Sequence, residues 1–289
     1  MANLEGIAGA YKSQRTALIP ATYSSEGACI NMNIPEYNSQ AWDKLADAQI
    51  RWSTPVSSRE IENARQGEWA IVLTPVKTVP RSWFGEVKGK DILCLASGGG
   101  QQAPILAAAG ARVVSFDNSA RQLELDELVA KQHHLELRTE QGDAADLSRF
   151  ADGSFDLIFH PCSNCFMAEL EPIWSECFRV LRPGGSLLSG FNQPFIYLFD
   201  RKAEENQGRL EVRHHLPYSD LESLTETERE AQIVKGEPLE FSHTLEEQIG
   251  GQIAAGFSIS GFYEDGWSDE ARLLNKYSPT FIATKSTKP

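Results

Sequence analysis

Three consecutive glycines, Gly98, Gly99 and Gly100, follow the apolar run DILCLA (91–96) and precede the alanine-rich stretch APILAAAG (103–110). A glycine loop between a strand and a helix can present backbone N–H groups to a ligand, because glycine lets the main chain approach that ligand closely. The glycines alone leave two interpretations open, a concave donor surface for a ligand or a turn required by packing.

An acidic residue, Asp117, ends the next apolar run, RVVSFD (112–117). Its distance from the glycines is close to the offset of roughly 20 residues expected of an acid that binds ribose hydroxyls. A strand-end aspartate can instead cap the following helix, and Ser119 with Gln122 has the spacing of a capping box there. The ribose interpretation is favoured, and the capping interpretation stays open.

Two further segments bring polar or small residues after a strand. The loop QGDAADL (141–147) carries Asp143, which can accept from an exocyclic amine, and Ala144, which leaves space for a flat base. The run SFDLIFH (154–160) ends at His160. Because open α/β sheets bind ligands at the carboxyl ends of their strands, these residues predict a nucleoside-shaped site together with the glycines and Asp117.

Strands and helices alternate from Asp91 onward, which predicts an α/β fold with a doubly wound, mostly parallel sheet. Short apolar runs are typical of parallel strands that are covered on both faces. The expected strands are 91–96, 112–117, 135–140, 154–160, 185–191 (after an RPGG turn), 258–265 and 280–286. The expected organisation is a flexible N-terminal extension over 1–34, a helical lead-in and possible lid over 35–86, and a core over 87–289 with an insertion at about 192–242.

The lead-in and the insertion carry more specific expectations. A helix within 37–52 has Asn38 or Ser39 available as its N-cap, and a second helix covers 57–69. In the insertion, 194–200 and 209–219 predict a hairpin, and 220–232 predicts a solvated helix. Aromatic residues of these parts either contact substrate and cofactor or pack on the core: Trp42, Trp52, Phe195, Tyr197, Phe199, His214, His215 and Tyr218.

The bulk composition favours a small-molecule partner. The 289 residues carry a formal charge of −13, which disfavours binding to phosphate backbones. No apolar stretch is long enough to span a membrane, and five cysteines without a secretory leader are typical of reduced thiols, so we expect a cytoplasmic protein. Cys162 and Cys165 form a C-x-x-C pair, but a fourth zinc ligand does not come close, and we expect no metal. The oligomeric state stays open.

With these features the chain resembles the class I S-adenosylmethionine-dependent methyltransferases over about residues 87–191, and the "type 11" small-molecule branch fits best. The most specific phrase is RVLRPGGSLL (179–188). The family's loop usually reads acid-x-Gly-x-Gly-x-Gly, whereas this chain has Cys94 for the acid and Ala96 for the first glycine. The resemblance implies S-adenosylmethionine as cofactor, S-adenosylhomocysteine as product and a small-molecule methyl acceptor.

The resemblance also implies a place for each candidate residue around that cofactor. Asp117 would bind the ribose, and the backbone of His160 would lie near the sulfonium. The remaining assignments are Ala96, Ser97, Gly98, Gly99 and Gly100 to the methionine part, Asn118 and Gln122 beside the ribose or adenine, and Asp143 and Ala144 to the adenine.

Methyl transfer from a sulfonium is an in-line displacement in which the protein supplies alignment, so no particular acid or base is required. His160 is the candidate general base at the rim of the site, and its competing role is to fix the loop before Pro161. Two alternatives remain. An NAD-dependent oxidoreductase could use the same loop, since Gly98–Ala103 also satisfies G-x-G-x-x-A, and a noncatalytic protein could bind the cofactor without turnover.

Overall fold

The computed structural model describes residues 32–268 and 271–289. The chain divides into two units, Met1–Asn33 and Ile34–Pro289, and the description that follows concerns the second. The extension expected over residues 1–34 therefore falls almost entirely outside the described residues. Within the described part, no helix combines the length and apolar character needed to cross a bilayer.

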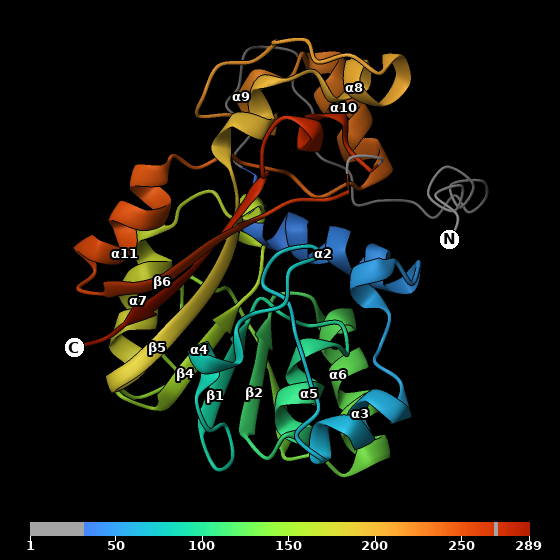
Figure 1. The fold of residues 1–289 in the computed structure, drawn as a ribbon. Helices are drawn as coiled ribbons and strands as arrows, with labels where there is room; N and C mark the ends of the chain where they lie inside the picture. The colour runs from blue at the N-terminus through green and yellow to red at the C-terminus, as the bar shows by residue number, and fades with distance from the viewer. Residues whose placement is uncertain (1–31, 269–270) are drawn as a thin grey trace. The chain divides into compact units, whose positions relative to one another are not determined.

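A seven-stranded sheet forms the centre of this unit, in the order β3-β2-β1-β4-β5-β7-β6 (Figure 1). The first five strands are parallel, and β7 and β6 are antiparallel to their neighbours. This confirms the predicted doubly wound, mostly parallel sheet. The strands are β1 (Asp91–Leu95), β2 (Arg112–Asp117), β3 (Leu137–Gln141), β4 (Phe155–His160), β5 (Leu181–Asn192), β6 (Ser258–Asp265) and β7 (Phe281–Thr287).

Helices cover both faces of the sheet, which explains why the central strands are continuous apolar runs. Along β1, Ile92 and Cys94 pack in one buried cluster, and Leu93 and Leu95 pack in the other. The first cluster lies under α3 (Ser58–Arg65), α4 (Arg81–Phe84), α5 (Gln102–Ala108) and α6 (Ala120–His133); the second lies under α7 (Glu171–Val180) and the segment of η4 (Glu246–Gly250) and α11 (Gly251–Ala254).

The lead-in helix α2 (Ile34–Asp47) crosses the end of the sheet between the strands and the insertion helices (Figure 1). It begins earlier than predicted, because Asn38 is not a cap but a buried residue one turn inside the helix. Asn38 Nδ2 donates to Phe166 O (2.8 Å) and Leu239 O (3.1 Å), and its Oδ1 accepts from Leu239 N (2.8 Å). Long-range partners, which a helical pattern does not reveal, decide its position. The short helix η1 (Arg51–Ser53) follows.

Strand β5 also begins earlier than predicted. Leu181 already pairs with Phe155, and the ladder resumes only at Ser186 beside Leu157. The RPGG segment (182–185) therefore bulges out of a longer strand and is not a turn that precedes it. Gly184 has a φ of 79°, a conformation that suits glycine in such a bulge.

The predicted aromatic hairpin of the insertion is wrong. Residues Pro194–Leu198 form a 3-10 helix, η3, and the two segments share only a single bridge between Phe199 and Val212 among the described residues. Proline at the first position fixes a φ suited to a helical start and removes a donor from any ladder. The remaining helices are η2 (Asn164–Phe166), α8 (Arg201–Gln207), α9 (Asp220–Ser223), α10 (Glu226–Lys235) and η5 (Leu273–Lys276).

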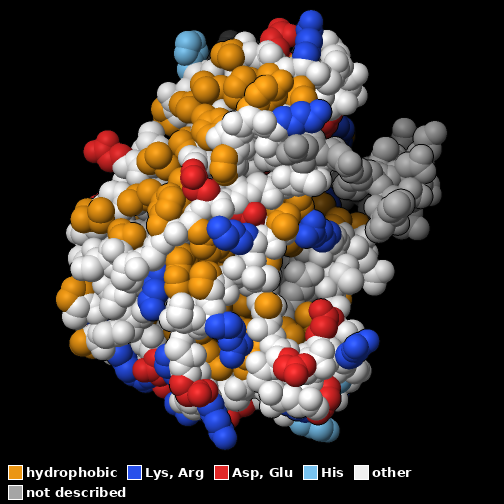
Figure 2. Space-filling view, in the orientation of Figure 1, with side chains coloured by type: hydrophobic (Ala, Val, Ile, Leu, Met, Phe, Trp, Pro, Cys, Tyr) orange, Lys and Arg blue, Asp and Glu red, His pale blue; other side chains and the backbone are white. Residues whose placement is uncertain are grey.

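The predicted helix over 220–232 is two helices, α9 and α10, because Thr225 caps the second one with a complete capping box. Helix α10 has no buried residue, which confirms its solvated character. Figure 2 shows hydrophobic side chains gathered at the top of the view, over the insertion. Val212 and Val234 of the insertion are 69% and 74% exposed, so this part of the chain does not bury all of its apolar surface.

Candidate cofactor site

The N–H groups of the three glycines are all paired within the chain. A buried amide must find an acceptor, and here the acceptors come from the end of β2 and from α6. The expectation that these groups form a free concave donor surface is therefore wrong in this structure. The pairs are Gly98 N to Asp117 Oδ2 (3.0 Å), Gly99 N to Gln122 O (2.9 Å) and Gly100 N to Asp126 Oδ1 (2.8 Å).

The lead-in packs directly on the glycine loop. A Cβ added to Gly99 would lie 2.3 Å from Trp52 O, and one added to Gly100 would lie 2.9 Å from Pro55 Cβ. Both glycines have positive φ values, and Val56 N donates to Gly100 O (2.9 Å). These two glycines are thus required by a close main-chain contact, which supports the packing interpretation of the loop.

Two of the predicted cofactor residues carry buried polar atoms without a partner. The hydroxyl of Ser97 and the amide oxygen Oε1 of Gln122 have no hydrogen bond in the structure. Gln122 Nε2 does donate, to Ser53 Oγ (2.8 Å). Because buried polar atoms are nearly always paired, each of these two atoms indicates a group that a ligand can satisfy. The residues present therefore fit a polar cofactor beside the loop.

Asp117 occupies the end of β2 and holds the loop against the next helix. Its Oδ2 accepts from Gly98 N, and its Oδ1 accepts from Ser119 N (3.0 Å). Burial raises the pKa of Asp117, although these backbone hydrogen bonds oppose the shift. The backbone N–H of Asn118 also donates to this carboxylate. A carboxylate has about four acceptor positions, so about one remains for a ligand hydroxyl. A helix cap is also present beside Asp117. Ser119 is the N-cap of α6, and its Oγ accepts from Gln122 N (3.1 Å).

Asn118 contacts the lead-in and not an open space. Its carbonyl oxygen accepts from Ser39 Oγ (2.6 Å) and Gln141 Nε2 (3.0 Å), and its Nδ2 donates to Pro35 O (3.3 Å). The start of α2 therefore covers the end of β2, at the place predicted for the ribose and adenine.

The loop after β3 brings Asp143 and Ala144 to the same edge of the sheet, but with mainly structural contacts. Asp143 Oδ1 accepts from Ala145 N (3.0 Å), which closes a local turn. Ala144 is buried in the core cluster under α7. The prediction that it leaves open space for a flat base is therefore wrong in this structure. Its small side chain is required by that packing.

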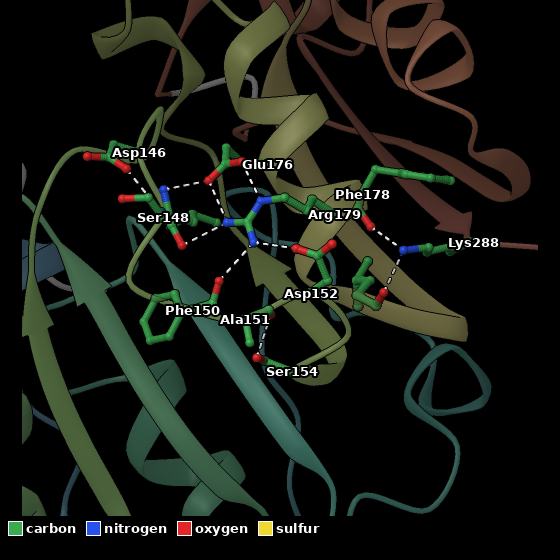
Figure 3. Close-up of polar contacts among 12 residues, drawn as sticks. Asp146, Ser148, Phe150, Ala151, Asp152, Ser154, Glu176, Phe178, Arg179 and Lys288 are labelled. Atoms are coloured by element: carbon green, nitrogen blue, oxygen red, sulfur yellow. Dashed lines mark hydrogen bonds and ion pairs between the residues drawn. The ribbon is translucent and has the colours of Figure 1, made fainter.

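Arg179 of α7 holds the rest of this loop (Figure 3). In the sequence, Arg179 stands out only as the first residue of the family phrase, and no local pattern reveals this role. All five guanidinium N–H groups are used. The acceptors are Glu176 Oε1 (2.7 Å) and Oε2 (2.8 Å), Asp152 Oδ1 (2.9 Å), Phe150 O (2.8 Å) and Leu147 O (2.9 Å).

His160 lies in the core and not at the rim. Its side chain is fully buried, Nδ1 pairs with Leu95 O (2.9 Å), and Nε2 pairs with the side-chain amide of Asn164 (2.6 Å). Burial lowers the pKa of His160. With both nitrogens engaged, the geometry favours the competing structural role over that of a general base, because the ring holds the end of β1 beside the loop after β4.

The two cysteines after β4 belong to a polar group that reaches the insertion. Cys162 Sγ donates to Asn192 Oδ1 (3.1 Å), Asn192 Nδ2 donates to Tyr197 Oη (3.0 Å), and Tyr197 Oη donates to Glu240 Oε2 (2.9 Å). The neighbouring Cys162 thiol and burial raise the pKa of Cys165. The described residues contain no group of three or more His, Cys, Asp or Glu side chains that could hold a metal ion.

Of the aromatic residues predicted to meet a substrate, three lie together: Tyr197 stacks on Tyr218 (5.3 Å between ring centroids), and His214 meets Tyr218 edge-on (5.0 Å). The two lead-in tryptophans lie apart from this group. Trp42 contacts Phe166 edge-on (5.0 Å), and Trp52 contacts Trp267 (5.9 Å).

A cavity of about 700 Å³ lies beside the glycine loop, on the side of Gln101 and Gln102. Trp52, Trp69 and Ile105 are among its other lining residues. Neither this cavity nor the smaller one of about 370 Å³ near Trp267 is lined by Gly98, Asp117 or Asp143. In this structure the predicted cofactor residues are brought to one edge of the sheet, and the lead-in covers the glycine loop and Asn118.

Comparison with known proteins identifies the family of this fold. A family model described as a methyltransferase domain matches residues 93–189. A protein of Bacillus subtilis (strain 168) named uncharacterized methyltransferase YbaJ is 47% identical over 252 residues, which cover 87% of this chain and 97% of that protein. The demethylmenaquinone methyltransferase of Thermus thermophilus is 38% identical over 101 residues, which cover 34% of this chain and 46% of that enzyme.

Solved structures show the same fold at low sequence identity. An S-adenosylmethionine-dependent methyltransferase from Mesorhizobium loti has a TM-score of 0.55 and 18% identity, covering 72% of this chain and 95% of that one. The [4+2]-cyclase SpnF has a TM-score of 0.56 and 16% identity, covering 88% of this chain and 97% of that one. Together with the extended match to the Bacillus protein, these findings show that the chain belongs to the class I S-adenosylmethionine-dependent methyltransferases.

Proposed function

We propose that this methyltransferase binds S-adenosylmethionine at the edge formed by the glycine loop, the end of β2 and the loop after β3, and methylates a small molecule. The observation that carries the proposal is the pair of buried, unpartnered polar atoms, Ser97 Oγ and Gln122 Oε1, beside that loop. A cofactor with amino, carboxylate and ribose hydroxyl groups offers partners to both atoms, which a purely structural loop leaves unsatisfied.

When bound, the cofactor supplies an activated methyl carbon on a sulfonium. The residues of the chain supply orientation, which can lower the barrier by roughly 7–11 kcal/mol. His160 contributes to this by holding Leu95 O, the last carbonyl of β1, against the loop that follows β4. A general base is required only if the acceptor must lose a proton.

The acceptor is proposed to be a small molecule of the cytoplasm. Two relatives that align with part of this chain are named for small molecules, demethylmenaquinone in Thermus thermophilus and a sterol in Pneumocystis carinii. The net charge of −13 disfavours a nucleic-acid acceptor. The polar group of Cys162, Asn192, Tyr197 and Glu240 follows the ends of β4 and β5, next to the position proposed for the methyl group.

The sequence leaves two alternatives to this function open. The family membership favours methyl transfer over NAD-dependent oxidation, because the Bacillus and Mesorhizobium proteins are named as methyltransferases. The fold alone would not decide between turnover and another role, since SpnF is named as a cyclase. A test of binding and a test of turnover are therefore both needed.

Binding is tested by titrating the protein with S-adenosylhomocysteine in a calorimeter, with NADH as the comparison ligand. We expect binding of the former only; binding of NADH alone would overturn the proposal. Asp117→Ala should lower the affinity about tenfold or more, because a charge-assisted hydrogen bond contributes about 1.5–3 kcal/mol. Asp47→Ala, which removes an exposed acid of α2, is the control and should leave the affinity unchanged.

Because Asp117 also accepts from Gly98 N, the alanine variant combines two losses. Asp117→Asn keeps one oxygen for that amide, so it separates support of the loop from recognition of the ribose. An affinity of Asp117→Ala equal to that of the wild type would contradict the ribose assignment. Turnover is followed as release of S-adenosylhomocysteine with candidate acceptors.

A further inference from the structure

A second carboxyl group, that of Asp126, contacts the glycine loop. Asp126 is not among the site residues predicted from the sequence. Asp126 of α6 is completely buried. Its Oδ1 accepts from Gly100 N (2.8 Å), and its Oδ2 accepts from Ser115 Oγ (2.6 Å). The side chain thus connects α6, β2 and the glycine loop at one point inside the protein.

The groups that face Asp126 do not neutralise a negative charge. The titratable neighbours are Cys94 of β1, Asp117 of β2 and Glu127 of α6, and the charges of the last two oppose ionisation of Asp126. In the part of the chain that the structure describes, no ion pair to Asp126 is formed. A buried carboxylate without a cation is unfavourable, so burial favours the neutral acid.

Burial raises the pKa of Asp126 from 3.8 to about 7, although the hydrogen bonds from Ser115 and Gly100 oppose this shift. A neutral carboxyl group still satisfies both contacts. Its carbonyl oxygen accepts from Gly100 N, and its hydroxyl can donate to Ser115 Oγ. Protonation therefore removes the buried charge without loss of the hydrogen bond to the loop.

We infer that Asp126 is a positioning residue that holds the glycine loop in its binding conformation through the Gly100 amide, and that this closed conformation is most stable when the buried carboxyl group carries its proton. The inference rests on the proposed function, since it concerns the loop proposed to receive the cofactor. It adds a second buried carboxyl group on which the pH dependence of that loop rests, beside Asp117, whose pKa burial also raises.

The sign of the pH dependence follows from linkage. When the loop is closed, Asp126 holds its proton up to a pH of about 7, and when the loop opens to water, the carboxyl returns toward its ordinary pKa of 3.8. The closed loop binds the proton more tightly, so its stability falls as the pH rises from about 4 to 7, by up to about tenfold in the equilibrium constant per pH unit. Above about pH 7 this contribution stays constant.

The test compares the wild type with Asp126→Asn and Asp126→Leu by titration with S-adenosylhomocysteine between pH 5.5 and 8.5. Asn keeps an oxygen for Gly100 N and an amide to donate to Ser115 Oγ, and it carries no charge at any pH. We expect this variant to bind within about threefold of the wild type at pH 5.5 and to lose less affinity at higher pH. Leu has a similar size but no acceptor, and we expect it to bind about tenfold more weakly or worse.

A direct signature comes from the Gly100 amide itself. In protein labelled with ¹⁵N-glycine, the Gly100 resonance should shift with a midpoint near pH 7 in the wild type and should not titrate in Asp126→Asn. Circular dichroism shows whether Asp126→Leu is folded; if it is not, Asp126→Asn and the resonance still decide. A Gly100 titration of unchanged midpoint and size in Asp126→Asn, its absence from the wild type, or wild-type affinity in folded Asp126→Leu would overturn the inference.

Failure of this inference is distinct from failure of the proposed function. If the wild type does not bind S-adenosylhomocysteine at any pH, the proposed cofactor is wrong, whereas the Gly100 resonance still reports whether Asp126 holds the loop. If the ligand binds equally well to all three proteins at every pH, the cofactor is right and the role of Asp126 is wrong.

Discussion

Replacement of Arg179 should show how much the loop after β3 depends on one side chain (Figure 3). Arg179 is 28% exposed and uses all five of its N–H groups within the chain. The ion pair with Asp152, which is 81% exposed, contributes about 0–1 kcal/mol. The larger loss in Arg179→Ala comes from the carbonyl oxygens of Leu147 and Phe150, which lose a charged donor.

Hydrogen bonds to a charged group contribute about 1.5–3 kcal/mol each, and partial access of water to this site lowers that value. We therefore expect Arg179→Ala to reduce the free energy of unfolding by about 2–4 kcal/mol. A loss of about 3 kcal/mol lowers Tm by roughly 5 °C in a protein of this size. Arg179→Lys should lose nearly as much, because an ammonium group cannot form the planar fork that meets Glu176 and both carbonyls at once.

The measurement is urea unfolding followed by circular dichroism, with Arg209→Ala as the control. Arg209 is 61% exposed and pairs only with the exposed Glu211 in the described structure, so its removal should change the free energy of unfolding by less than about 0.5 kcal/mol. If Arg179→Ala were as stable as this control, or if Arg179→Lys matched the wild type, Arg179 would not hold the loop after β3 and the reasoning would be refuted.

Gly99→Ala should lower the free energy of unfolding by about 1–3 kcal/mol, because its φ is 114° and a Cβ would lie 2.3 Å from Trp52 O. Gly67→Ala, with a φ of 85° and open space around the Cβ, measures the backbone strain alone, so equal losses would show that the lead-in contact does not matter. Burial lowers the pKa of His160 below 6.5, so the unfolded chain takes up a proton that the folded chain does not, and stability falls as the pH decreases below about 6.5. His160→Gln should show a smaller fall between pH 7 and 5 in urea unfolding; an unchanged slope would exclude this group as its source.

Local patterns in the sequence predict most of the core. The runs that end at Asp117 and His160 form the strands β2 and β4 with those C-terminal ends, because buried parallel strands need continuous apolar residues. Thr244 and Glu247, which have the spacing of a capping box in the sequence, form one at the start of the segment before β6. These features depend on neighbours within a few residues, which a pattern can reveal.

The partners of the site residues depend on contacts between distant segments. The pattern places Asp117 at a strand end but does not reveal that its carboxylate accepts from Gly98 N. Likewise, the glycine triplet leaves open a ligand site or a packing turn, and only the structure shows that the lead-in packs on it at Trp52. In the sequence, Asp126 is one of three acidic residues within 120–133, and only the structure shows that it faces inward to Gly100.

The contacts of Asn38 have a consequence for exchanging specificity among relatives. This residue joins α2 to Phe166 in the loop after β4 and to Leu239 at the end of the insertion, and both α2 and the insertion lie outside the 93–189 match to the family. A chimaera that imports only one of these two coverings would leave buried amide groups of the other unpaired. A change of specificity therefore requires that α2 and the insertion be exchanged together, whereas the sheet can be kept.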